Sequence, residues 1–317
     1  MNIFTVKNAT GRKNQAGAVL LVVIITMVVL TVIGMAIYSM IYTATLNQVI
    51  AQGAAKAFYI AESGIRIAAS EYKASANKDS TLINLQNKIF TMPNSQGQCS
   101  LELYPYWFYL PAASAPITVT ANTTTSIILY LPGAVPPTDD AGTTAITFPV
   151  GGQLKYKNGT YTETYNTATP GIYDSAKGMP VTFTFTSIHH NAYTISPGDE
   201  FYLGYGYNST ATPAAAGGSL TLADPNSTWQ IFPPHNGRIF VDQPTNVCQY
   251  SYGLRDTSVA STITLTNIQF IQCINLAQGG TYIPPVPFFP ASTDTPYQYN
   301  IYIGKSLGIR STSTYGN

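Results

Sequence analysis

Few side chains in this sequence have the types and spacing that enzymatic chemistry requires. The segment Gly304–Gly308 (GKSLG) matches the G-x-S-x-G pattern that presents a nucleophilic serine. That pattern needs a following helix and then an Asp and a His, but only nine residues follow Gly308 and the last histidine is His235. Tyr299 stands where a phosphate-binding loop would have its first glycine. The sequence therefore predicts a protein that is not an enzyme.

Metal binding also has few candidate ligands. Of the three histidines, His189 and His190 are adjacent in a strand-like stretch, where alternation points them to opposite faces. The acids Asp139-Asp140, Asp199-Glu200 and Asp224 lie in turn-like segments, where calcium sites also occur. The spacing of an EF-hand is missing, and turn formation explains these aspartates equally well. We expect no metal and no other cofactor.

The composition narrows the classes of partner. The 317 residues include 15 Lys and Arg against 14 Asp and Glu, so there is no basic excess for nucleic acid. Only 9% of residues are charged while 45% are hydrophobic and 23 are tyrosine, which excludes a disordered chain. The outer surface is expected to consist of Thr, Ser, Asn, Tyr and Gly, as in extracellular filaments, adhesins and many other secreted β-sandwiches.

Two of the three cysteines are placed to form a disulfide. The midpoint between Cys248 and Cys273 falls at Val259–Ser261, so a hairpin folded there brings the two side chains opposite each other. Buried thiols, or a bond from Cys99 to either one, are the alternatives.

The elements that would position these residues begin with a membrane segment. No charged residue lies between Asn14 and Ala55, and Ala18–Tyr42 is almost wholly apolar. A helix of that length reaches about 37 Å, enough to cross a hydrocarbon core of about 30 Å. Lys7, Arg12 and Lys13 precede the span, which predicts a cytoplasmic N-terminus and export of everything after about residue 45.

The helix is expected to continue beyond the membrane to about Lys73. Apolar residues recur at steps of three and four from Leu46 to Tyr72, and no proline interrupts them. Glu62 and Arg66 are spaced to pair on one face. Small residues allow close helix packing, namely Ala51, Gly53, Ala54 and Ala55.

Two segments carry a resemblance to a known family. The basic leader that ends in Gly17, followed by the apolar helix that begins AVLL at Ala18, resembles the class III leader of type IV prepilins. This implies cleavage between Gly17 and Ala18 by a prepilin peptidase, and methylation of the new N-terminus. The segment Ala57–Ile65 (AFYIAESGI) is similar to the N-terminal domain of PilX-type minor pilins. The residues of its helix packing motif would be Ala61, Glu62, Ser63, Gly64 and, one turn on from Glu62, Arg66.

One departure from the family bears on function. Main filament subunits have a glutamate at the fifth mature position, where this chain has Val22. Because a buried carboxylate requires a partner, its absence favours a minor, priming or tip subunit of a type IV pilus. A K-like minor pseudopilin of type II secretion shares the absence, and a signal-anchored adhesin or lectin is a further alternative. The resemblance implies an inner-membrane single-pass protein that later joins an extracellular filament, with other pilin subunits as partners.

The rest of the chain predicts a β-rich domain that would mediate adhesion in such a filament. Residues 1–17 would be the leader, 18–73 the helix, 74–98 a linker with one short helix, and 99–317 an antiparallel sandwich of one or two units. The fold class is thus α+β. Asn158-Gly159 predicts a two-residue hairpin turn between Gln153–Lys157 and Thr160–Thr164. The aromatic run Leu103–Leu110 either anchors the sheet to the helix or forms an exposed binding platform. Further strands are expected at Ile117–Thr120, Ile127–Leu131, Pro180–Thr186, Glu200–Tyr207, Arg238–Val241, Thr262–Ile271 and Tyr297–Ile303.

Overall fold

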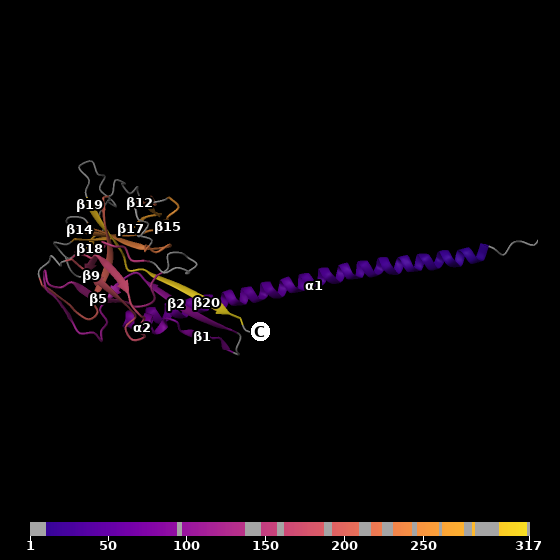
Figure 1. The fold of residues 1–317 in the computed structure, drawn as a ribbon, viewed down its shortest axis with the longest axis horizontal. Coiled ribbons are helices and arrows are strands. Elements are labelled where there is room, and N and C mark those ends of the chain that lie inside the picture. Colours follow the sequence, from indigo (N-terminus) through magenta and orange to yellow (C-terminus); the bar gives the residue numbers. More distant parts are fainter. Residues whose placement is uncertain are drawn as a thin grey trace, which may run out of the picture.

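A long helix followed by a largely antiparallel β domain forms the fold, which confirms the predicted α+β layout (Figure 1). The fold comes from a computed structural model of the chain. Within the helix, side chains are described from Val19 onward. The structure describes residues 11–93, 97–136, 147–156, 162–186, 192–208, 217–223, 231–242, 246–259, 262–275, 281–282 and 298–315.

Helix α1 runs without interruption over Gly11–Ala74. It starts within the predicted leader, so Gly17 and Ala18 both lie in helical backbone, and it ends one residue after Lys73. The hydroxyl of Thr26 donates to the carbonyl of Val22 at 2.7 Å, which satisfies a polar group inside the apolar run. At the other end, the Lys78 ammonium donates to the carbonyls of Tyr72 and Lys73 at 2.6 and 2.9 Å and caps the helix.

The segment expected to be a linker is instead packed structure. Helix α2, Lys78–Leu85, is capped by the Asn77 side chain, which accepts from the Ser80 N–H at 3.1 Å. Its Leu82, Ile83 and Leu85 side chains are buried. Strand β1, Ile89–Thr91, pairs with β2, Gln98–Pro105. The predicted short helix is present. It does not behave as part of a linker, because its three buried apolar side chains attach it to the domain.

The largest sheet, as far as the structure describes it, has 12 strands. Its order brings together strands far apart in sequence, since β19 lies between β13 and β11 and β3 lies between β11 and β5. One path across it is β18 (Thr281–Tyr282), β17 (Gln269–Asn275), β14 (Asn246–Ser251), β13 (Arg238–Asp242), β19 (Gln298–Ile303), β11 (Glu200–Asn208), β3 (Phe108–Tyr109), β5 (Ser126–Leu131), β9 (Met179–Thr184) and β8 (Thr167–Pro170). Beside it, β6 (Gln153–Tyr156) pairs with β11 and with β7 (Thr162–Thr164).

Three smaller sheets complete the domain. Strand β2 pairs with β1 and with β20 (Leu307–Thr314), and β4 (Ile117–Val119) pairs with β10 (Tyr193–Ile195). The third sheet contains β12 (Leu220–Ala223), β16 (Thr262–Thr266) and β15 (Leu254–Asp256). From Cys99 onward the described residues form no helix, as the sequence predicts.

One hairpin prediction and one strand prediction meet different outcomes. Strands β6 and β7 pair Lys155 with Thr162 and Gln153 with Thr164, a register centred between Asn158 and Gly159. The turn itself lies outside the described residues. The predicted strand Thr262–Ile271 is two strands, β16 and β17, because Asn267 between them has a φ of 54°. Asparagine tolerates that left-handed backbone, which breaks the strand.

Two apolar cores hold the domain together. The larger lies within the β domain and contains buried side chains from Tyr106 to Ile303. The smaller joins α1 and α2 to the sheets and contains Ala68, Leu82, Leu85, Leu101, Leu103, Trp107, Tyr202 and Tyr302. Trp107 and its neighbours in the aromatic run are buried, so this run anchors the sheets to the helices and offers no exposed platform.

Candidate functional site

The residues considered for catalysis and metal binding do not assemble into a site within the described part of the chain. His189, His190, Asp139, Asp140 and Asp224 lie outside the described residues. No group of three or more His, Cys, Asp or Glu side chains gathers there to hold a metal. The Asp199 carboxylate accepts the Ser196 N–H at 2.6 Å, which is the turn role expected of it.

The segment Gly304–Gly308 connects two strands of the β domain. Strand β19 ends at Ile303 and β20 begins at Leu307, so a strand follows Ser306 where a nucleophile elbow would require a helix. The Ser306 hydroxyl accepts the N–H of Arg238 at 3.1 Å and thus helps to hold the loop. This arrangement agrees with a structural role.

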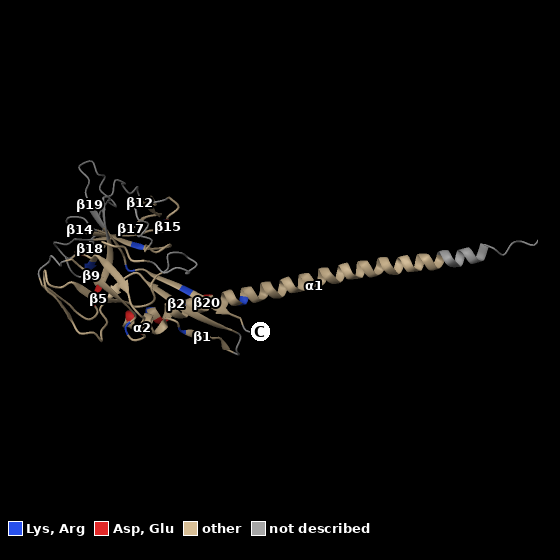
Figure 2. Ribbon diagram, viewed as in Figure 1, with Lys and Arg blue, Asp and Glu red and all other residues tan. Residues whose placement is uncertain are grey.

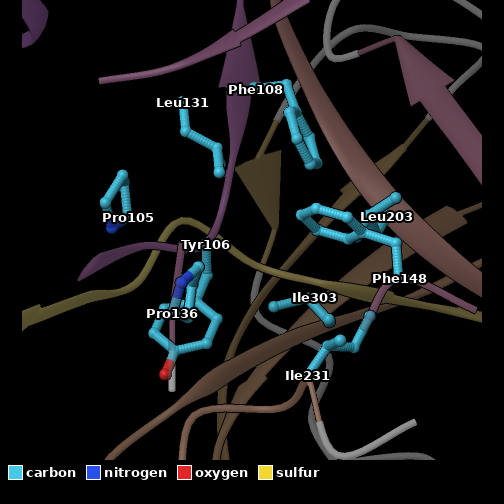
Figure 3. A pocket seen from close by; sticks show the side chains of 9 residues that line it. All are labelled: Pro105, Tyr106, Phe108, Leu131, Pro136, Phe148, Leu203, Ile231 and Ile303. Atoms are coloured by element: carbon cyan, nitrogen blue, oxygen red, sulfur yellow. The ribbon is translucent and has the colours of Figure 1, made fainter. Parts of the chain in front are cut away.

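The described cavities are poor ligand sites. One, lined mainly by apolar side chains that include Phe108, Phe148, Leu203 and Ile303, has a volume of about 10 Å³ (Figure 3). That is room for no more than about one water molecule. A second, open hollow of about 260 Å³ lies beside helix α1 between Tyr59 and Tyr315.

The largest exposed feature is the apolar part of helix α1. Every side chain from Val19 to Ile50 is exposed, and α1 is apolar and long enough to cross a membrane once. In Figure 2 this stretch carries no charged residue before Lys56, and it projects away from the β domain. Leu46, Val49 and Ile50 prolong the apolar surface toward the domain. Exposure of this extent marks a surface that lipid or another protein covers.

The second half of α1 packs on the domain along one stripe, which we call the seam. Ala57, Ile60, Gly64 and Ala68 recur at steps of three and four and face β2, β20 and α2. Ala68 belongs to the smaller core, and Ile60 is buried near Gly97. The seam joins helix α1 to the β domain through packed side chains.

Gly64 sets the closest approach in the seam. A Cβ atom at this position would lie 2.6 Å from Cys99 Sγ and 3.0 Å from Ser311 Oγ. Both partners point from the sheet toward the helix, because Cys99 and Leu101 on β2 face Ser313 and Ser311 on β20 in register. Only glycine allows the helix backbone to come this close to the sheet.

Polar contacts fix the end of the seam that is nearer to the exposed apolar part of α1. The Ser313 hydroxyl donates to the Ala57 carbonyl at 2.6 Å, and the Lys56 ammonium donates to the Tyr315 hydroxyl at 2.9 Å. The Lys56 ammonium also lies 4.8 Å from the centre of the Tyr315 ring, within the range of a cation–π contact. The last described strand is thus tied to the helix where the helix leaves the domain.

The predicted packing motif divides between the seam and the surface. Gly64 lies in the seam, while Ala61 and Ser63 are half-buried and the Ser63 hydroxyl donates to the Tyr59 carbonyl at 2.8 Å. Glu62 and Arg66 form the expected ion pair at 2.7 Å, with the Arg66 side chain 77% exposed. An ion pair this exposed adds little stability. Sequence reasoning missed the sheet partners Cys99, Ser311 and Ser313, because no local pattern links strands so distant from the helix.

A largely buried ion pair lies against Trp107 and Tyr202 of the smaller core. The Lys305 ammonium contacts Glu200 Oε1 at 2.6 Å and lies 4.6 Å from the centre of the Trp107 ring. The Tyr202 hydroxyl donates to Glu200 Oε2 at 3.0 Å. Burial, and then the Glu200 carboxylate, raise the pKa of Tyr202 well above its usual value. Trp107 Nε1 donates to Asp79 at 3.4 Å, which connects the pair to α2.

Cys248 and Cys273 form a disulfide, and Cys99 is a buried free thiol. The two bonded cysteines lie opposite each other on β14 and β17. Between those strands the chain forms an inner hairpin of β15 and β16. Its turn lies between Asp256 and Thr262, around the midpoint at Val259–Ser261 that the cysteine spacing predicts. The disulfide closes the base of this nested hairpin.

No known protein family, curated protein or solved structure matches the chain. Function is therefore inferred from the exposed helix, the seam and the β domain that the seam holds.

Proposed function

We propose that this chain is a minor, priming or tip subunit of a type IV pilus or a related filament. The helix would hold the subunit in the inner membrane and later pack among the helices of other subunits. The β domain would project outward and mediate adhesion. The leader 1–17 would first be removed by a prepilin peptidase, and the protein would act as a structural subunit and not as an enzyme.

The observation that carries the proposal is the uncovered length of helix α1. From Val19 to Lys56, where the first described contact with the β domain occurs, the helix extends about 57 Å. A hydrocarbon core takes up about 30 Å of it, so several uncharged helical turns, which include the exposed Leu46, Val49 and Ile50, extend beyond the lipid. A simple membrane anchor has no use for this surplus. Helices of neighbouring subunits would cover the part of α1 that extends beyond the lipid. In the filament they would also replace lipid around the part that had been inside the membrane.

The seam supports the same proposal. A filament subunit must transmit force between its helix and its outer domain, and the seam joins the two without a flexible linker. Val22 is consistent with a minor subunit, because it leaves no carboxylate in the apolar helix that a neighbour would have to neutralise.

N-terminal sequencing and intact-mass analysis test the proposal. Protein is purified from membranes of cells with and without an active prepilin peptidase. We expect the mature chain to begin at Ala18, with an N-methyl group, only where the peptidase is active. Gly17→Leu should keep the leader, whereas Gly34→Leu should be cleaved normally, since Gly34 has no heavy atom of the described chain near its Cβ position.

The outcomes separate the alternatives. Recovery of the mature chain with sheared pili supports the pilus role, while loss of protein secretion on deletion supports the pseudopilin role. A leader that is retained in the presence of active peptidase would overturn both and leave a signal-anchored surface protein.

A further inference from the structure

One face of the large sheet presents hydroxyl groups in a regular array. Strands β5, β9 and β8 are the last three strands in the order of that sheet. In Figure 1, β5 and β9 lie at the end of the domain that is turned away from helix α1. Their alternate side chains are buried on the inner side, among them Ile127, Val181 and Phe183. The opposite, outer side is the threonine face, which consists of Ser126, Ile128, Thr167, Thr169, Thr182 and Thr184.

Strand register places these six residues in two rows. Ser126, Thr184 and Thr167 are aligned across the three strands, and so are Ile128, Thr182 and Thr169. Neighbours lie about 4.8 Å apart across the strands and about 6.8 Å apart along them. The face is therefore a grid of closely spaced side chains, of which five carry a hydroxyl group and four of those five, the threonines, also carry a methyl group.

Hydrogen bonds within the face hold some of its hydroxyls in place. The Oγ1 atoms of Thr167 and Thr184 lie 2.6 Å apart, so one donates to the other. Just beyond them, Asn166 Nδ2 donates to Thr186 Oγ1 at 2.7 Å. Because threonine is stiff at χ1, little side-chain freedom remains to be lost when a ligand binds.

The chemistry of the face selects the class of partner. Strands β5, β8 and β9 contain no charged residue, so the face has nothing to pair with an anionic polymer or a charged protein surface. Among the six residues Ile128, 46% exposed, is the only large aliphatic side chain, and the next outer residue of β5, the half-buried Tyr130, adds one aromatic ring opposite Pro180. The face thus offers few of the large apolar anchors that a hydrophobic protein interface requires. A neutral polysaccharide offers hydroxyl and C–H groups that match the hydroxyl and methyl groups of the grid.

We propose that the threonine face binds neutral polysaccharide chains laid flat across β5, β9 and β8. This deepens the proposed function, on which it rests, by naming what the projecting domain of the subunit would adhere to.

A binding assay on the purified full chain tests the inference. The protein is kept in an amine oxide detergent, since glycoside detergents would compete, and is mixed with insoluble cellulose, insoluble chitin or alginate gel. Depletion from the supernatant is measured against the amount of polysaccharide. We expect depletion by cellulose or chitin but not by anionic alginate.

Paired substitutions locate the binding. Thr169→Val with Thr182→Val removes two hydroxyls, keeps the shape of both side chains, and should weaken binding about tenfold. Thr221→Val with Thr264→Val is the matched control, because those hydroxyls lie 3.2 Å apart on β12 and β16, away from the threonine face. The control should bind as the parent does, and thermal unfolding should show all of the proteins folded.

Three results would overturn the inference: no depletion by either neutral polymer, equal depletion by alginate, or equal binding by both pairs of variants. Cleavage after Gly17 is scored on the same preparations. Normal cleavage without binding defeats this inference alone, whereas binding with a retained leader defeats the filament role and leaves the threonine face as the site of an anchored adhesin.

Discussion

At the scale of single residues, Gly64 and Lys305 stabilise the junction of helix and domain in different ways. Gly64 contributes by having no side chain, which lets α1 lie directly over Cys99 and Ser311. Lys305 contributes a charge that is 29% exposed and pairs with a Glu200 side chain that is 10% exposed. Because the Glu200 side chain is almost wholly shielded from water, this pair tolerates the loss of Lys305 less well than the exposed pair of Glu62 and Arg66 tolerates the loss of either partner.

Replacing Gly64 by valine should therefore damage the seam. We expect Gly64→Val to lower the free energy of unfolding of the domain by about 1–3 kcal/mol, because the new methyl groups overlap Cys99. Thiol modification of Cys99, measured with the protein in detergent, should become faster. Gly53→Val is the matched control, since Gly53 lies in the same helix with no heavy atom of the described chain near its Cβ position. Equal thermal stability of the two variants would contradict this account of the seam.

At the scale of elements, the nested hairpin β14–β17 shows what the sequence can and cannot predict. The disulfide follows from the symmetric placement of its cysteines about a turn, and the β6–β7 register follows from Asn158-Gly159. Both depend on local chemistry. The position of β19 between β13 and β11, and the pairing of β2 with β20, depend on contacts between distant segments that carry no local signal. The burial of α2 was missed for the same reason, since its short apolar run resembles an exposed linker helix.

Loss of the disulfide should destabilise this element. The bond closes a loop with a sequence separation of 25 residues, which corresponds to about 3 kcal/mol in the chain-entropy account. A reducing agent should lower the thermal midpoint of the parent protein. The variant Cys248→Ser with Cys273→Ser should have a lower midpoint from the start and should not respond to the reducing agent. A parent protein that does not respond while free-thiol counts show the bond broken would refute the prediction.

At the scale of the whole molecule, buried tyrosines link the parts of the fold. Burial is the main cause that raises the pKa of each of four hydroxyls, on Tyr109, Tyr165, Tyr202 and Tyr252. Their unfolded pKa is about 10, so in alkaline solution the folded state keeps protons that the unfolded state releases. The stability that they contribute is complete below pH about 10 and is lost as the pH rises above it.

The domain should consequently unfold cooperatively in alkali. Each of these hydroxyls that stays protonated while the fold persists should lower the free energy of unfolding by about 1.4 kcal/mol per pH unit above about 10. We expect tyrosinate absorbance to rise in two stages: first the exposed tyrosines, then the buried ones together with loss of β-sheet circular dichroism. A single titration near pH 10 with the fold intact would contradict the burial of these side chains.

The seam also has a consequence for the order of events in the cell. It joins α1, which the ribosome makes before every strand, to β20, which follows all the other strands of the described domain. In the proposed filament subunit, the helix would enter the membrane long before its partners Ser311 and Ser313 exist, and Gly64 would be covered only from the β2 side until β20 has been translocated. A chain that stalls during export would leave the β20 side of the seam open to chaperones and proteases, so a closed seam would mark subunits whose translocation has passed β20.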